Sequence, residues 1–371
     1  MDAAHLALTT AQVLLCTLAL SIALGAVLQA THFCTMGAIS DMVLMRDPIR
    51  LQQWALAAAV AMWGFAAMQW AGWVDPRESI YGADKLLWLS SLLGGTFFGS
   101  GMVLASGCSS KSLVRLGAGN LKALVVLLVM GVFGLATLKG FLAVWRVKGL
   151  ETVYGYAPEQ AFVGSWLALQ TGLSTPVASA MAALVVGGAL LVWALRGLAK
   201  APVSMTWGGL AVGGAVVALW WISGVWGHGS EHPETLEAFY VATGSGRMES
   251  FSFTSPVAMA LDAFMYFSDG TKKITIGMVS VLGVMVGACV RALLSGTFRW
   301  EGFVNRSDLV RHVIGGALMG VGGVMAMGCT FGQGMSGLST LSWMSLLTLV
   351  SIGLGAGLTL IWQLRQMERS L

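Results

Sequence analysis

Charged residues are scarce in this chain, and their scarcity excludes a soluble globular protein. They make up 10% of its 371 residues, 56% of the residues are hydrophobic, and the mean hydropathy is +0.78. Soluble domains contain about 25% charged residues. The chain has no basic run of the kind that binds nucleic acid. We therefore predict an all-α polytopic membrane protein without a large domain outside the membrane.

Cysteine is also rare, and its spacing excludes several kinds of site. The chain has five cysteines, and none of them forms a CxxC or CxxH pair. This spacing argues against a zinc site, an iron–sulfur cluster and a disulfide framework. A nucleotide-binding loop is absent as well. We expect no metal, no cofactor and no enzymatic activity, and we expect thiols in apolar surroundings to stay protonated.

Apolar runs long enough to cross a bilayer, which takes about 20 residues, predict about nine transmembrane helices. They cover approximately 8–30, 52–73, 86–107, 121–144, 175–196, 204–223, 274–296, 309–328 and 341–363. Shorter apolar pieces at 33–45, 108–119 and 329–340 predict re-entrant helical segments, which are tolerated at membrane depth only under protein cover or beside a polar cavity. Two further pieces, 160–172 and 255–267, are expected to form short helices at the outer surface.

One fifteen-residue stretch occurs twice. Residues 94–108 and 315–329 are identical at eight of fifteen positions without a gap, and both end in Gly-Cys. Each copy carries a small-xxx-small pair, Gly95/Gly99 and Gly316/Gly320, which allows another helix to approach closely in lipid. Each is followed by a polar or glycine-rich turn. A thiol therefore recurs where a membrane helix is interrupted.

Basic residues predict the orientation, because lysine and arginine accumulate on the cytoplasmic side. With the N-terminus outside and the C-terminus in the cytoplasm, the inner side receives thirteen of the twenty-one basic residues and the outer side twelve of the seventeen acidic ones. The thirteen are Arg46, Arg50, Lys111, Arg115, Lys122, Arg196, Lys200, Arg291, Arg299, Arg306, Arg311, Arg365 and Arg369.

In this orientation the helices before Cys108 and Cys329 run in opposite directions, so the two copies are inverted. Inverted repeats with broken helices are typical of transporters whose pathway lies between the repeats. We predict a single transport domain over 1–371. Its inverted repeats cover about 10–144 and 274–363, with connecting helices at about 175–223 and an outer loop at 224–273. A weaker match relates the Gly25 stretch to the Gly283 stretch.

The interruptions have the chemistry of a weak anion site. A half-helix exposes free backbone N–H groups at its start, and these favour an anion. Ser109 and Thr330 add hydroxyl donors, Gln333 adds an amide and Lys111 a positive charge. Neutral thiols add weak S–H donors and a polarisable surface, which suits a soft, sulfur-bearing ligand. Loose binding of this kind favours conduction.

The sequence allows two interpretations of each cysteine, packing or function. Cys16 and Cys289 favour plain packing, whereas Cys34, Cys108 and Cys329 occupy helix breaks and favour function.

The remaining polar candidates are equally open. His32 either shuttles a proton or bonds to backbone, Lys111 and Arg115 either attract an anion or mark the cytoplasmic face, and Asp41 is either functional at membrane depth or a helix cap. His228 and His232 have the spacing of a metal pair, but a solvated loop is the simpler explanation.

The motifs resemble the YeeE/YedE family of sulfur-transport proteins of the bacterial inner membrane. They are Phe-Cys-Thr-Met-Gly-Ala at 33–38, the two Gly-Cys breaks, and Gly-Cys-Thr-Phe-Gly-Gln-Gly-Met-Ser-Gly-Leu-Ser at 328–339. The resemblance implies thiosulfate uptake through an hourglass-shaped protein of nine long helices, in which cysteine thiols hydrogen-bond the anion along the path. The family's three cysteines fall on Cys34, Cys108 and Cys329, and its glutamine falls on Gln333.

The resemblance also implies partners and leaves alternatives. A small cytoplasmic sulfur carrier of the TusA type often works with such transporters, and the membrane lipid surrounds them. One alternative is a channel for another sulfur or selenium species, since one branch of the family is associated with selenium. Another is a membrane thiol oxidoreductase, which needs two thiols whose Cα atoms lie within about 7 Å; the lack of CxxC argues against it.

Overall fold

The computed structural model describes residues 3–157, 160–229, 238–269 and 273–370. The helices of the first half are α1 (Ala3–Thr31), α2 (Thr35–Leu44), α3 (Ile49–Trp70), α4 (Trp88–Leu104), α5 (Ser109–Gly117), α6 (Leu121–Leu138), α7 (Phe141–Lys148) and α8 (Val163–Thr171). Those of the second half are α9 (Thr175–Leu198), α10 (Val203–Trp221), α11 (Thr254–Met265), α12 (Ile276–Leu294), α13 (Arg306–Met325) and α14 (Trp343–Ser370).

Minor elements complete the chain. Two short 3-10 turns, η1 (Pro76–Glu78) and η2 (Leu150–Thr152), and two π-helical stretches, η3 (Ile222–Trp226) and η4 (Gly332–Gly337), lie between the helices. The strands form two antiparallel pairs: β1 (Lys85–Leu86) with β2 (Gly155–Tyr156), and β3 (His228–Gly229) with β4 (Phe239–Tyr240). The predicted all-α polytopic class is therefore confirmed.

Eight helical segments of the described chain are long and apolar enough to cross a membrane. They correspond to eight of the nine predicted spans. The ninth, α13, forms at the predicted place but falls short in hydropathy, because Arg306, Asp308, Arg311 and His312 occupy its first two turns. It still packs along α4 and α6 like the other long helices.

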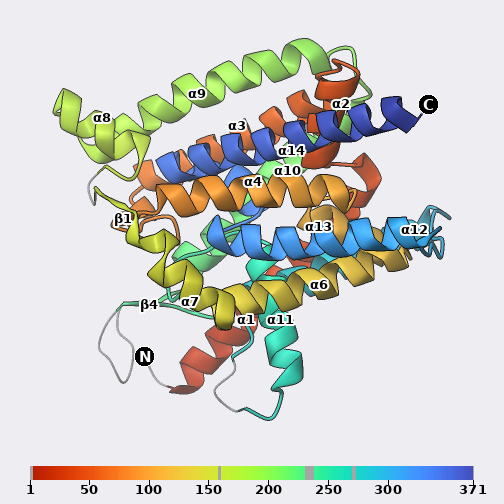
Figure 1. The fold of residues 1–371 in the computed structure, drawn as a ribbon. Helices are drawn as coiled ribbons and strands as arrows, with labels where there is room; N and C mark the ends of the chain where they lie inside the picture. The colour runs from red at the N-terminus through yellow and green to blue at the C-terminus, as the bar shows by residue number, and fades with distance from the viewer. Residues whose placement is uncertain (1–2, 158–159, 230–237, 270–272, 371) are drawn as a thin grey trace.

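The long helices run roughly side by side between two faces (Figure 1). One face carries the start of α1 together with β1, β4, α7 and α8, and we call it the N-terminal face. The opposite face carries the end of α14, and we call it the C-terminal face. Polar residues at turns begin several helices: the side chains of Asn120, Thr275 and Asn305 accept N–H bonds at the starts of α6, α12 and α13.

Helices of the first half pack on helices of the second half in a reciprocal pattern, which we call the exchanged packing. Helix α1 packs on α12 while α3 packs on α10, α4 packs on α14 while α6 packs on α13, and α4 and α13 cross each other. The short helices repeat it, since α2 meets α14 and α11 meets α6. This exchange is what two copies related by a two-fold axis produce, if one copy is α1–α6 and the other α10–α14.

Glycines at the predicted small-xxx-small pairs permit these contacts. A Cβ at Gly99 would lie 2.1 Å from the carbonyl oxygen of Ile352 in α14, and one at Gly320 would lie 2.5 Å from that of Met130 in α6. The close approach predicted from the repeat is therefore confirmed, in equivalent places of both copies. Gly25 meets Val284 of α12 in the same way, so the Gly25 and Gly283 stretches lie against each other.

Candidate functional site

Each of the three cysteine-bearing breaks has the same backbone feature. The residue two positions before the cysteine is in the left-handed region although it is not glycine: His32 has φ 52°, Ser106 has φ 57° and Met327 has φ 54°. This conformation is uncommon for residues with a side chain. It turns the chain sharply at the end of α1, α4 and α13, so that the next half-helix starts inside the bundle.

The two Gly-Cys breaks also share their hydrogen bonds. The N–H of Gly107 donates to the carbonyl of Met102, and the N–H of Gly328 donates to that of Gly323, both at 2.8 Å. These bonds close the last turn of α4 and α13 in the manner of a Schellman cap. The duplicated sequence therefore forms a duplicated structure.

All three cysteines directly precede a half-helix, and two of them accept a backbone N–H at its first turn. The sulfur of Cys34 accepts from Gly37 at 3.3 Å, and that of Cys329 accepts from Gly332 at 3.4 Å. Cys108 makes no such capping bond, and its sulfur lies 3.3 Å from the hydroxyl of Ser110. The thiols therefore occupy the N-cap position, where an oxygen side chain is usual.

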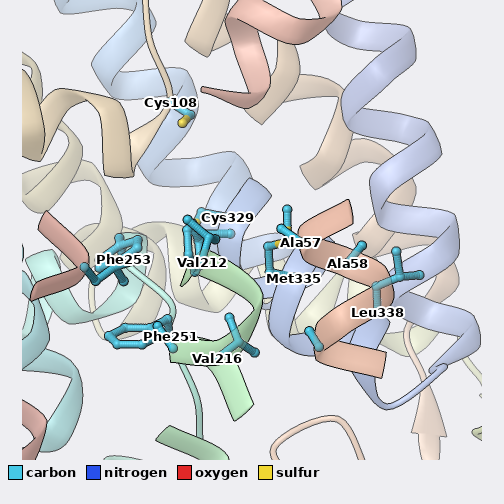
Figure 2. Close-up of a cluster of buried hydrophobic side chains, with 14 of the residues drawn as sticks. Ala57, Ala58, Cys108, Val212, Val216, Phe251, Phe253, Cys329, Met335 and Leu338 are labelled. Atoms are coloured by element: carbon cyan, nitrogen blue, oxygen red, sulfur yellow. The ribbon is translucent and has the colours of Figure 1, made fainter. Parts of the chain in front are cut away.

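These half-helix starts converge. Cys108 and Cys329 lie in one buried cluster together with Phe33, the residue before Cys34. The hydroxyl of Thr330 is buried there without a hydrogen-bond partner among the described residues. Cys108 and Cys329 are both 0% exposed. Figure 2 shows them facing a common region of the core. The structure thus places Cys108, Cys329 and Thr330 in the buried core, whereas Cys34 is partly exposed.

The sequence missed a fourth break. Helix α11 was expected to lie at a surface, but its first residue, Thr254, is 0% exposed and hydrogen-bonds the hydroxyl of Ser109 at 2.8 Å. Thr254 is the first residue of α11, as Thr35 is of α2, and Phe253 holds the position before the helix that Cys34 holds before α2. The sequence signal for this break is Phe251-Ser252-Phe253 before the helix, and it lacks the Gly-Cys pair that marks the repeat.

An aromatic cluster covers Cys329 on one side. Phe251, Phe253 and Phe331 are almost fully buried, and the rings of Phe253 and Phe331 meet edge to face at 5.3 Å. Figure 2 places Phe251 and Phe253 beside Cys329, with Met335 on the other side. The segment 241–253, which the sequence assigned to an outer loop, thus contributes buried side chains to the region of the breaks.

Gln333 is held in place by two hydrogen bonds. Its amide nitrogen donates to the carbonyl of Ala326 at 2.7 Å, and its amide oxygen accepts from the hydroxyl of Ser345 at 2.6 Å. The side chain is 2% exposed. It therefore links the end of α13 to α14 across the Cys329 break.

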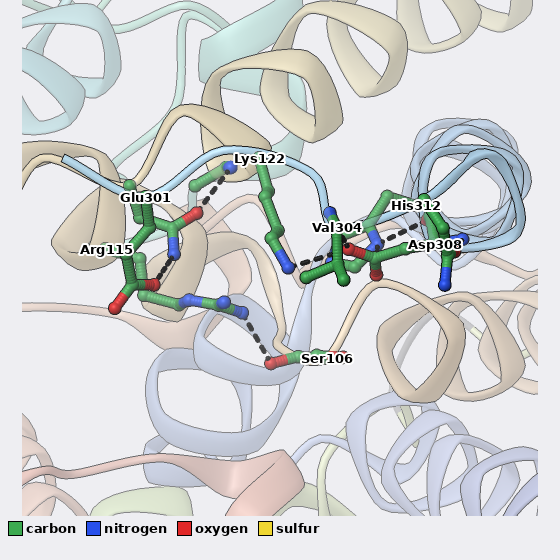
Figure 3. A network of polar contacts seen from close by, with 10 residues as sticks. Ser106, Arg115, Lys122, Glu301, Val304, Asp308 and His312 are labelled. Carbon is green, nitrogen blue, oxygen red and sulfur yellow. Dashed lines mark hydrogen bonds and ion pairs between the residues drawn. The ribbon is translucent and has the colours of Figure 1, made fainter.

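Basic residues lie at the opposite end of the Cys108 half-helix, toward the C-terminal face. Arg115 donates to the carbonyl of Ser106 at 3.1 Å, which fixes the left-handed residue of the break (Figure 3). Beside it Asn120 bonds Glu301, and Lys122 pairs with Asp308 at 2.7 Å. Lys111 is half-buried, and among the described residues no carboxylate lies within salt-bridge distance of it.

The other candidates lie elsewhere. Asp41 pairs with Arg50 at 3.2 Å, and Cys16 and Cys289 are half-buried within α1 and α12. His228 is exposed in β3 and its ring lies against Tyr240, whereas His232 falls outside the described residues.

Comparison with known proteins identifies the family. Residues 30–358 match a family model described as "Sulphur transport", and this range contains all three cysteine breaks. The chain belongs to the sulphur-transport (YeeE/YedE) family. This family member is 27% identical over 342 residues to the thiosulfate transporter TsuA of Escherichia coli K12, covering 90% of this chain and 89% of the relative. It is 26% identical over 343 residues to TsuA of Spirochaeta thermophila, covering 91% and 95%.

Proposed function

We propose that this sulphur-transport family member takes up thiosulfate into the cytoplasm through the region where its half-helices meet. The observation that carries the proposal is that Cys34, Cys108 and Cys329 each precede a half-helix that interrupts the membrane helices, and that Cys108 and Cys329 lie in one buried cluster. The names of the two relatives support thiosulfate as the substrate.

The chemistry of the breaks suits a soft divalent anion. Backbone N–H groups at the half-helix starts attract negative charge, and neutral thiols donate weak hydrogen bonds to sulfur or oxygen. Thr330 and Ser109 place hydroxyls beside them. Thiosulfate, which carries both a soft sulfur and hard oxygens, matches this mixture of donors. Binding remains weak enough for release, as conduction requires.

The breaks are closed in this structure. Cys108 and Cys329 have no exposed surface, and the Thr254 hydroxyl is already bonded to Ser109. An anion therefore replaces existing contacts between the half-helices as it passes. Gln333 holds the Cys329 half-helix in register, and Lys111 supplies a charge toward the C-terminal face. In this proposal both assist passage.

The orientation and partners form part of the proposal. The basic residues favour a bacterial inner-membrane protein with the C-terminal face in the cytoplasm, where a TusA-like sulfur carrier would receive the product. Exposed apolar side chains on α9, such as Val185 at 72%, favour contact with lipid. The exchanged packing supports a second repeat that begins at α10, earlier than the 274–363 expected from sequence, with α7, α8 and α9 as the connection.

The test is uptake of labelled thiosulfate by a bacterium that lacks its own transporters. We expect Cys108→Ala and Cys329→Ala to abolish uptake although the protein reaches the membrane, and Cys289→Ala, a half-buried thiol away from the breaks, to leave it intact. Normal uptake by both break variants would contradict the proposal. Competition by sulfite, sulfide and selenite in the same cells tests the alternative substrates.

The alternative function, a thiol oxidoreductase, needs a pair of thiols that can be oxidised, and Cys34 and Cys108 are both free thiols. Alkylation followed by mass measurement separates the two functions. A conduit keeps both thiols free during turnover, whereas an oxidoreductase accumulates an oxidised pair.

A further inference from the structure

Two of the hollows on the N-terminal face differ in their charged residues. The first, of about 630 Å³, is lined by Lys85, Arg247, Asp84, Glu151 and Met327, and we call it the Lys85 hollow. The second, of about 570 Å³, is lined by Trp73, Asp75, Arg77, Glu78, His228 and Tyr240, and we call it the Asp75 hollow. The volume alone does not select one of them as the mouth of a transport path.

The charges favour the Lys85 hollow for an anion. Of its two acidic residues, Glu151 is already paired with Arg146 at 2.7 Å, so Asp84 is opposed by both Lys85 and Arg247. The Asp75 hollow instead carries two carboxylates against one arginine. A divalent anion therefore meets a more favourable field in the Lys85 hollow.

The Lys85 hollow continues toward a cysteine break. Lys85 and Met327 also line a small inner cavity of about 20 Å³, whose other walls include Tyr81, Ser342 and Gln333. Met327 is the left-handed residue two positions before Cys329, and it is 37% exposed. The inner cavity thus lies between the hollow and the Cys329 break.

The inner cavity is lined by a buried hydroxyl group without a hydrogen-bond partner among the described residues. Ser342 is 1% exposed, and its hydroxyl has no hydrogen-bond partner in the part of the chain that the structure describes. An unpaired buried hydroxyl costs about 1–3 kcal/mol, so such groups usually serve a ligand or a water. The cavity volume holds about one water molecule, and Ser342 directly precedes the start of α14.

We propose that the anion reaches the Cys329 break from the N-terminal face through the Lys85 hollow, and that Ser342 hydrogen-bonds it in the inner cavity. This inference rests on the transport function proposed above. Met327 and Tyr81 flank the inner cavity, and the Tyr81 hydroxyl donates to the carbonyl of Gly332 at 2.5 Å. Both side chains move aside for an ion larger than water.

The test uses a cysteine placed in each hollow. In a background in which Cys16 and Cys289 are replaced by alanine, Met327→Cys is compared with Trp73→Cys, which is 57% exposed in the Asp75 hollow on the same face. A negatively charged, membrane-impermeant methanethiosulfonate is applied to right-side-out and inverted vesicles. The side on which Trp73→Cys reacts identifies the N-terminal face.

We expect the reagent on Met327→Cys to lower the initial rate of thiosulfate uptake at least about tenfold, with thiosulfate slowing the labelling, and the reagent on Trp73→Cys to leave uptake unchanged. If Met327→Cys is inactive before labelling, Lys85→Cys takes its place. Uptake at the unlabelled rate after complete labelling in the Lys85 hollow, or block from the Asp75 hollow, overturns the inference while leaving transport itself established.

Ser342 is tested separately. Loss of one hydrogen bond to a charged ligand predicts that Ser342→Ala raises the KM for thiosulfate about tenfold, and Ser342→Thr, which keeps the hydroxyl, restores it. An unchanged KM in Ser342→Ala contradicts its role. If the wild-type protein itself takes up no thiosulfate, the proposed function fails first.

Discussion

Replacing the three break cysteines by serine separates capping from ion contact. Cys34 and Cys329 each accept a backbone N–H at the start of a half-helix, and Cys108 holds the same position without such a bond. Serine is among the best residues for that position, and alanine in its place costs about 1 kcal/mol per helix. The triple serine variant therefore keeps the caps and loses only the sulfur, whereas the triple alanine variant loses both.

The size of the effect on stability follows from two capping bonds. Two losses of about 1 kcal/mol each sum to about 2 kcal/mol. With an unfolding entropy of about 2.1 cal/mol/K per residue over 371 residues, the thermal midpoint falls by about 3 °C. We expect this fall in the triple alanine variant and little change in the triple serine variant, measured by tryptophan fluorescence of purified protein.

Thiosulfate uptake by the same two variants shows whether the thiols contact the ion. If the thiols contact the ion, the triple serine variant is stable but fails to take up labelled thiosulfate, because a hard hydroxyl replaces a soft thiol. If the cysteines only cap, serine restores uptake and only alanine reduces it. Wild-type uptake by the triple serine variant would refute our reasoning about the breaks.

Two further predictions concern packing and pH. Gly99→Ala should lower the thermal midpoint, because its Cβ would lie 2.1 Å from a backbone oxygen of α14, whereas Gly353→Ala, with nothing within 4 Å, should raise it by the better helix propensity of alanine; equal shifts would count against the close helix contact. Burial raises the pKa of the Glu249 carboxyl, so its stabilising contribution is complete below the unfolded pKa of about 4.3 and is lost as the pH rises through the raised folded pKa. The thermal midpoint should therefore fall more steeply with rising pH in the wild type than in Glu249→Gln, and parallel curves would contradict this assignment.

The repeat could be predicted from sequence because its signal is both local and duplicated. Gly-Cys after an apolar run predicted each break, and the small-xxx-small glycines predicted the close contacts seen at Gly99 and Gly320. The positions of the long helices followed from apolar runs. Helix α13 fell short of a span in hydropathy, because charges in its first turns face the C-terminal end of the bundle.

The fourth break could not be predicted in the same way. Before α11 the position that Cys34 holds before α2 is occupied by Phe253, and α11 follows a long polar loop instead of a membrane helix. The contact of Thr254 with Ser109 joins residues 145 positions apart, which periodicity within a segment cannot indicate. The hydrogen bond between Gln333 and Ser345 likewise depends on tertiary packing, as does the lack of a hydrogen-bond partner for the Ser342 hydroxyl among the described residues.

The two bonds of Gln333 have a mechanical consequence. One side chain clamps the last turn of α13 and the first turn of α14 to the half-helix between them. A separation of these three pieces from one another would strand an amide in a dry interior, which is costly. The end of α13, the Cys329 half-helix and the start of α14 are therefore held together as one unit, because separating any of the three breaks a buried hydrogen bond.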